Sequence, residues 1–114
     1  MGLSGSTMPN PAAKKLVDEM IASNKVVVFS KTYCPYCNMA KAALNKTGLK
    51  DLLVIELDER NDGDSIQDYL RTLSGIRSVP QVFVDKKFIA DGSKTKAMQA
   101  SGELIPILKN CGAL

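Results

Sequence analysis

A run of four consecutive apolar residues, from Val26 to Phe29, constrains the fold of this chain more than any other segment. A strand with water on one side alternates apolar and polar residues, whereas a strand covered on both faces is apolar throughout. The run therefore predicts an inner strand of a sheet that carries helices on both sides, as in α/β proteins. With 114 residues, the chain has the length of one such domain.

The other segments predict helices and strands that alternate along the chain. Helical periodicity follows Pro11 and Pro35, and it recurs in a third segment that ends near Gly75, where four apolar residues share one face: Ile66, Tyr69, Leu70 and Leu73. Apolar runs predict strands at 52–57, 81–84 and 88–90, and the last two strands are expected to form a hairpin. Two short helices are expected at 95–100 and 104–111. The order α-β-α-β-α-β-β-α-α indicates an α/β fold with a four-stranded mixed sheet flanked by about five helices. We expect residues 1–10 to be a flexible leader and residues 11–114 to form the domain.

Composition excludes several classes of function. The net charge of +3 is too small to indicate a nucleic-acid-binding protein. No apolar run approaches the length that spans a membrane, so we expect no membrane association. The first residues lack the basic start and apolar core of a secretory signal, and we therefore expect a cytoplasmic protein.

The residues with chemical potential are Cys34 and Cys37, which form a C-x-x-C directly after the first strand. Cys34 precedes Pro35, where a helix is expected to begin, so its sulfur lies beside free N–H groups that favour a thiolate, and Lys31 adds a positive charge. The chain contains no His, which excludes Cys–His catalysis. Cys37 is one helical turn further and can form a disulfide with Cys34, as a deeper and less acidic resolving thiol.

Metal binding and a purely structural role are the alternative functions of the cysteines. A structural zinc site needs four ligands, and with no His and Cys111 as the one remaining thiol we expect no metal. Cys111 falls on the apolar face of the last predicted helix, which favours a buried structural thiol, with regulatory oxidation or dimerisation as the alternative.

Two segments resemble the glutaredoxin family, in order and in spacing: Lys31-Thr32-Tyr33-Cys34-Pro35-Tyr36-Cys37 and Gly75-Ile76-Arg77-Ser78-Val79-Pro80-Gln81-Val82-Phe83. The C-P-Y-C form is that of the dithiol glutaredoxins, and the resemblance covers about residues 10–112. It implies a thioredoxin-like fold, a cis Pro80, and a glutathione-dependent thiol–disulfide oxidoreductase that reduces glutathionyl mixed disulfides and protein disulfides, with Cys34 as nucleophile. The residues that the resemblance assigns to catalysis are Cys34 and Cys37, and those assigned to glutathione are Lys31, Tyr36, Gln67, Arg77, Val79, Pro80 and Ser93.

The resemblance also implies partners and a cellular role. Glutathione would be the co-substrate, glutathionylated or disulfide-containing proteins the partners, and the protein a monomer that serves electron transport and cell redox homeostasis. The chain departs from the family at Ala90 to Lys94, where glutaredoxins carry a Gly pair and an acidic residue, so weaker binding of glutathione is expected there. Two other functions stay open: a glutathione-ligated iron–sulfur cluster carrier, and a thioredoxin-like reductase that does not use glutathione.

Overall fold

The structure is a computed structural model that describes residues 10–114, so the expected leader lies outside the described residues except for Asn10. Its elements, in chain order, are α1 (Pro11–Ser23), β1 (Val26–Ser30), α2 (Pro35–Lys46), β2 (Leu53–Glu56), the 3₁₀-helix η2 (Leu57–Glu59), α3 (Gly63–Ser74), β3 (Gln81–Val84), β4 (Lys87–Ala90), α4 (Gly92–Ser101) and α5 (Leu104–Asn110). The predicted order is confirmed, with η2 as an addition. None of the helices in residues 10–114 has both the length and the apolar character needed to span a membrane.

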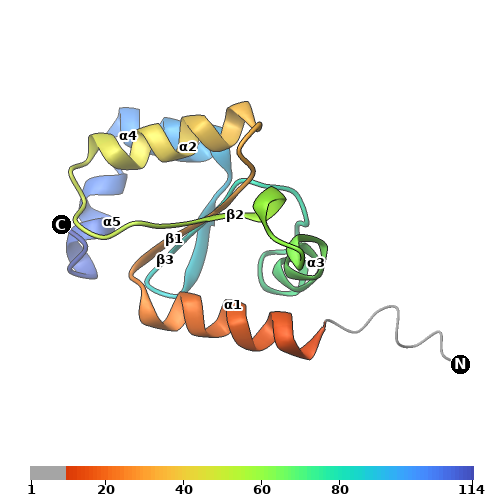
Figure 1. Cartoon of the computed structure of the whole chain (residues 1–114). Coiled ribbons are helices and arrows are strands. Elements are labelled where there is room, and N and C mark those ends of the chain that lie inside the picture. The colour runs from red at the N-terminus through yellow and green to blue at the C-terminus, as the bar shows by residue number, and fades with distance from the viewer. Residues whose placement is uncertain (1–9) are drawn as a thin grey trace, which may run out of the picture.

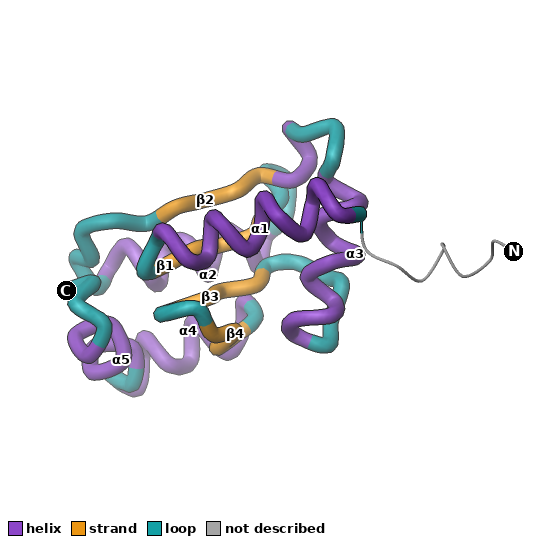
Figure 2. The backbone as a smooth tube through the Cα atoms, turned by 90° about the horizontal axis from the view of Figure 1, so that it is seen from below, coloured by secondary structure: helices purple, strands orange, loops and turns teal. Residues whose placement is uncertain are grey.

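The four strands form one mixed sheet in the order β2-β1-β3-β4, which Figure 2 shows from the side of α1. β1 runs parallel to β2 and antiparallel to β3, so that Val28 lies between Val54 and Val82. All five residues of β1 are buried, as the apolar run predicts for an inner strand. Because β1 and β3 are antiparallel, the end of β1 and the start of β3 meet at the same edge of the sheet.

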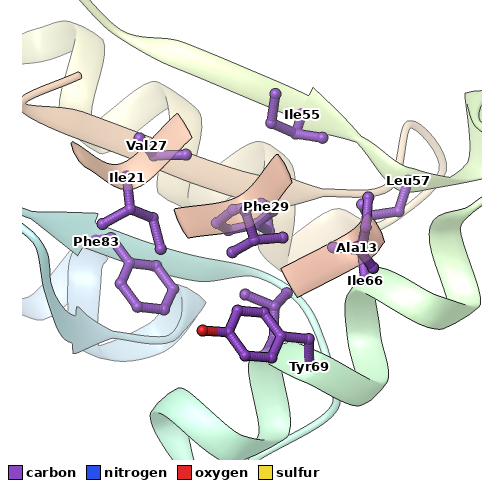
Figure 3. Packing of buried hydrophobic residues seen from close by; sticks show 11 residues of the cluster. Ala13, Ile21, Val27, Phe29, Ile55, Leu57, Ile66, Tyr69 and Phe83 are labelled. Atoms are coloured by element: carbon purple, nitrogen blue, oxygen red, sulfur yellow. The ribbon is translucent and has the colours of Figure 1, made fainter. Parts of the chain in front are cut away.

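Helices cover both faces of this sheet. α1 and α3 lie on one face, and α2 and α4 pack together on the other, with α5 beside α4 (Figure 1). Alternate residues of β1 serve the two layers, because successive side chains of a strand point to opposite faces. Val27 and Phe29 join the cluster with α1 and α3, where Figure 3 shows Phe29, Phe83 and Tyr69 close together. Val28 joins the cluster beneath α2 and α4.

Two details differ from the prediction. Leu73 shares the helical spacing of the buried residues of α3, yet 41% of it is exposed, because α3 ends one residue later and the apolar cover does not extend to its last turn. α4 begins at Gly92, three residues earlier than expected, since the Asp91 carboxylate accepts a hydrogen bond from the Lys94 N–H and caps the helix.

Candidate active site

Cys34 lies at the junction between the inner strand and helix α2. It is the N-cap residue of α2, and its Sγ accepts a hydrogen bond from the Cys37 N–H at 3.2 Å. Pro35 occupies the first helical position, where the missing N–H of proline costs nothing. The partly exposed sulfur therefore faces the positive end of the helix dipole, a position that suits an anionic group.

Cys37 lies on the inward face of the same helix turn and is fully buried. Burial, together with a hydrogen bond to Cys34, raises the pKa of the Cys37 thiol from 9.0 to about 11. One thiol is thus accessible at the start of the helix, and the other is buried and protonated at neutral pH.

The loop before β3 brings backbone groups to the same point. The Val79–Pro80 peptide bond is cis, as the family resemblance implies, and the Val79 carbonyl oxygen lies 3.9 Å from the Cys34 Sγ. Two buried amide side chains support this loop: Gln67 Nε2 donates to the Arg77 carbonyl, and Gln81 Nε2 donates to the carbonyls of residues 76 and 78. Three consecutive carbonyls are therefore held, which fixes the position of Val79.

Gln81 was not identified from the sequence. It is completely buried at the start of β3, and the signal that marks it is one polar residue at the head of an otherwise apolar strand. Its bonds to the loop satisfy backbone acceptors that would otherwise lack partners in the protein interior. We therefore place it among the residues that shape the site.

A first recess, of about 220 Å³, opens beside the cysteines between Tyr36, the loop before β3 and the start of α4; its lining residues are Tyr36, Ser78, Val79, Pro80, Asp91, Gly92 and Ser93. Four of the residues predicted to contact glutathione thus come together here. Gly92 permits the start of α4 to approach Tyr36 closely, because a Cβ on residue 92 would lie 2.7 Å from the Tyr36 carbonyl oxygen. Ala90, in contrast, is buried in the core, so its methyl group does not enter the recess.

A second recess, of about 180 Å³, lies on the other side of the cysteines and is lined by Lys31, Tyr33, Leu57, Asp58, Arg60, Asn61, Gly63, Asp64 and Gln67. Lys31 and Gln67, two of the residues expected to contact glutathione, both line this recess. Arg77 does not line this recess; its guanidinium pairs with Asp68 at 2.8 Å and with Asp64 at 3.4 Å. Hydrogen bonds from Thr32 lower the pKa of Asp58, and Lys31 contributes as well, so a carboxylate faces the lysine.

Comparison with known proteins accords with this geometry. The family model of glutaredoxin matches residues 26–89, more than half of the chain. The chain belongs to the glutaredoxin family. A glutaredoxin from Vernicia fordii is 47% identical over 96 residues, which cover 84% of this chain and 91% of that protein.

Solved glutaredoxin structures share the fold. Oxidized glutaredoxin 2 from Chlamydomonas reinhardtii has a TM-score of 0.86 and 45% identity, covering 94% of this chain and 100% of that chain. A buckwheat glutaredoxin–glutathione complex has a TM-score of 0.83 and 39% identity, covering 90% and 93% of the two chains. The protein is therefore a glutathione-dependent thiol–disulfide oxidoreductase with a thioredoxin-like fold.

Proposed function

We propose that this glutaredoxin reduces glutathionyl mixed disulfides and protein disulfides, with Cys34 as the attacking thiolate and glutathione as the reductant. The observation that carries the proposal is the Cys34 sulfur at the start of α2, accessible and hydrogen-bonded to the Cys37 N–H at 3.2 Å. A thiolate is the reactive form in disulfide exchange, and this position stabilises it without a general base.

The reaction follows from the two cysteines. The Cys34 thiolate attacks the glutathionyl sulfur of a mixed disulfide, a Cys34–glutathione disulfide forms, and the substrate leaves as a thiolate. A second glutathione thiolate then attacks this disulfide, which regenerates Cys34 and releases oxidised glutathione. With a protein disulfide as substrate, Cys37 attacks instead, and the Cys34–Cys37 disulfide forms while the second substrate thiol leaves.

The two recesses suit the two ends of glutathione. We propose that Lys31, Gln67 and Arg77 receive its glycine carboxylate, and that the Val79 backbone pairs with its cysteine as an added strand would. Arg77 must then share or leave its carboxylate partners, Asp64 and Asp68. Since those pairs are exposed, the exchange costs little free energy.

The other end of glutathione meets the segment that departs from the family. Tyr36, Pro80 and Ser93 line that recess, and Asp91 is the acidic group beside them, in place of the acid that glutaredoxins usually carry there. We propose that Asp91 faces the glutathione amino group. Its negative charge would offset part of the loss of glutathione affinity expected from the positive charge of Lys94.

The test is a glutathione-coupled reduction of a small mixed disulfide. Cys34→Ser abolishes the reaction, whereas Cys37→Ser retains most of it because glutathione replaces the resolving thiol. Activity in Cys34→Ser would refute the mechanism. Supplying electrons through thioredoxin reductase instead of glutathione separates this function from that of a thioredoxin-like reductase, and a brown, dimeric preparation would instead favour the cluster carrier.

We further propose a monomeric, cytoplasmic protein without a resident metal, which acts on glutathionylated proteins in electron transport and redox homeostasis. Gel filtration at several concentrations and metal analysis of the purified protein test the first two points, and fractionation of cells tests the third.

A further inference from the structure

The turn that leads from β1 to the nucleophile is held by a carboxylate that the mechanism above does not use. The turn runs from Lys31 to Cys34, and the Cys34 N–H closes it with a hydrogen bond to the Lys31 carbonyl at 3.1 Å. Inside the turn, the Thr32 N–H donates to Asp58 Oδ1 at 2.9 Å, and the Thr32 hydroxyl donates to Asp58 Oδ2. Both oxygens of one carboxylate therefore bind a single residue of the turn, 26 positions away in sequence.

Asp58 lies on a segment that its neighbours hold in place. It is the middle residue of η2, the short 3₁₀-helix that follows β2. The preceding residue, Leu57, is buried in the cluster under α1 and α3, to which Ile66 also belongs (Figure 3). The start of α3 packs directly against η2, because a Cβ on Gly63 would collide with the Leu57 carbonyl. The exposed Asp58 side chain thus projects from a well-packed support.

The turn itself has little other support. Thr32 is exposed, and 69% of Tyr33 is exposed. Among residues 10–114, no segment other than η2 forms a hydrogen bond with Thr32. Surface turns without such bonds are more mobile than the elements that they connect. The two bonds to Asp58 therefore restrict the turn to one position.

The second recess lies where the turn meets η2. One of its walls is the turn, which contributes Lys31 and Tyr33, and the opposite wall contains Asp58 on η2 and Gln67 on α3. The bonds between Thr32 and Asp58 join these two walls, so they set how far Lys31 lies from the residues opposite. This recess is the one proposed above to receive the glycine carboxylate of glutathione.

We propose that Asp58 is a positioning residue for glutathione, which holds Thr32 and thereby keeps Lys31 where the glycine carboxylate of the ligand binds. Asp58 acts through the turn, and it touches neither of the reacting sulfur atoms. The inference rests on the proposed function, because it concerns the same glutathione site.

Positioning and electrostatics act in opposite directions at Asp58. Hydrogen bonds from Thr32, together with the charge of Lys31, hold the pKa of the Asp58 carboxyl below its ordinary value, so it is ionised at neutral pH. A negative charge in the recess repels the carboxylate of glutathione. If charge alone mattered, removing it would strengthen the binding of glutathione, whereas loss of positioning weakens it.

The test is steady-state kinetics of the glutathione-coupled reaction with variants at both ends of the contact. Thr32→Val removes the hydroxyl and keeps the charge of Asp58, and it raises KM for glutathione roughly three-fold, with kcat within about two-fold of that of the natural protein. Asp58→Ala removes both bonds and raises KM roughly three- to ten-fold, although the repelling charge is gone. Thr32→Ser keeps both donors, so KM stays within about two-fold of the natural value.

The two substitutions also depend on each other. In the double variant that carries Thr32→Val and Asp58→Ala, KM is no higher than with Asp58→Ala alone, because the bond that Thr32→Val removes is already absent. The matched control is Glu59→Gln, which removes the next carboxylate of η2, an exposed group without a hydrogen bond or ion pair among residues 10–114. Its KM stays within about two-fold of the natural value.

A small neutral disulfide that contains no glutathione reports on the nucleophile separately. Thr32→Val and Asp58→Ala reduce it stoichiometrically at a rate within about two-fold of that of the natural protein, because Cys34 keeps its place at the start of α2. An equal loss of rate with this disulfide would overturn the inference, since it indicates a disturbed nucleophile or fold instead of a lost ligand contact.

A KM for glutathione that is unchanged or lower in Asp58→Ala would also overturn the inference. If Asp58→Ala fails to fold, Thr32→Val compared with Thr32→Ser decides alone. A natural protein that shows no glutathione-coupled turnover would refute the proposed function, and the inference with it, before any variant is made. An active natural protein with indifferent variants would refute the inference alone.

Discussion

The substitution Gly92→Ala probes how tightly the start of α4 is packed against the active site. A Cβ at this position would lie 2.7 Å from the Tyr36 carbonyl oxygen, 2.8 Å from Tyr36 Cβ and 3.1 Å from Pro80 Cγ. Gly92 does not adopt the left-handed backbone conformation, so alanine meets no backbone strain of its own. The atoms that it meets belong to the backbone, to a Cβ and to a proline ring, and none of them can rotate away.

The magnitude follows from two opposed effects. Alanine in place of glycine stabilises a helix interior by about 1 kcal/mol, and by less in the first turn. Overpacking a site whose neighbours cannot move costs about 1–3 kcal/mol. We expect a net loss of about 1–2 kcal/mol in the free energy of unfolding, and a fall of roughly ten-fold in kcat/KM for the glutathionyl substrate because the recess between Tyr36 and α4 widens.

Urea unfolding followed by circular dichroism measures the first effect, and the glutathione-coupled assay measures the second. The matched control is Lys96→Ala, an exposed substitution on the same helix, with an expected change within about 0.5 kcal/mol. A Gly92→Ala protein that is about 1 kcal/mol more stable than the natural one, with full activity, would show that helix propensity alone governs this position. The packing of α4 against the active site would then be refuted.

Three further predictions concern other parts of the molecule. Folding raises the pKa of the Cys37 thiol from the ordinary 9.0 to about 11. Between pH 9.0 and about 11 the unfolded chain therefore binds fewer protons than the folded protein, so the free energy of unfolding falls as the pH rises through this range. The fall is on the order of 1–3 kcal/mol, and it is measured by urea unfolding against pH as the difference from Cys37→Ser, which lacks it. Tyr69→Phe removes a hydrogen bond to the Asp18 carboxylate across α1 and α3 and lowers the free energy of unfolding by about 1–2 kcal/mol; equal stability of the two proteins in urea would contradict that bond. Arg77→Ala raises KM for glutathione roughly three- to ten-fold with kcat nearly unchanged, whereas an unchanged KM in steady-state kinetics would remove Arg77 from the binding site.

The sequence predicts the framework well because its signals are local. The apolar run at β1 predicts the strand, and Pro35 predicts the start of the helix that follows it. The position of Cys34 between the two elements follows from these local signals. The order of elements then determines which strands are neighbours, since short crossovers in such proteins allow few topologies.

The supporting residues could not be predicted in the same way. Gln81 and Asp58 each act on groups that are distant in sequence, and no periodic pattern indicates which backbone carbonyl or which turn a polar side chain meets. The departure at Ala90 and Asp91 is similar: the family pattern predicts weaker binding of glutathione there, whereas in the structure Ala90 lies in the core and Asp91 both caps α4 and lines the recess. Tertiary packing determines where these side chains lie, and the sequence of one segment does not show how that segment packs against the others.

The antiparallel pairing of β1 with β3 means that this active site does not exist in any contiguous piece of the chain. Cys34 and the Val79 carbonyl oxygen are 45 positions apart in sequence and 3.9 Å apart in space. Closing a loop of that length is entropically unfavourable until the strands pair. Until the sheet forms, the newly synthesised chain therefore has its two cysteines without the Val79 backbone beside them. Recovery of glutathione-dependent disulfide exchange can accordingly report the formation of long-range structure during refolding.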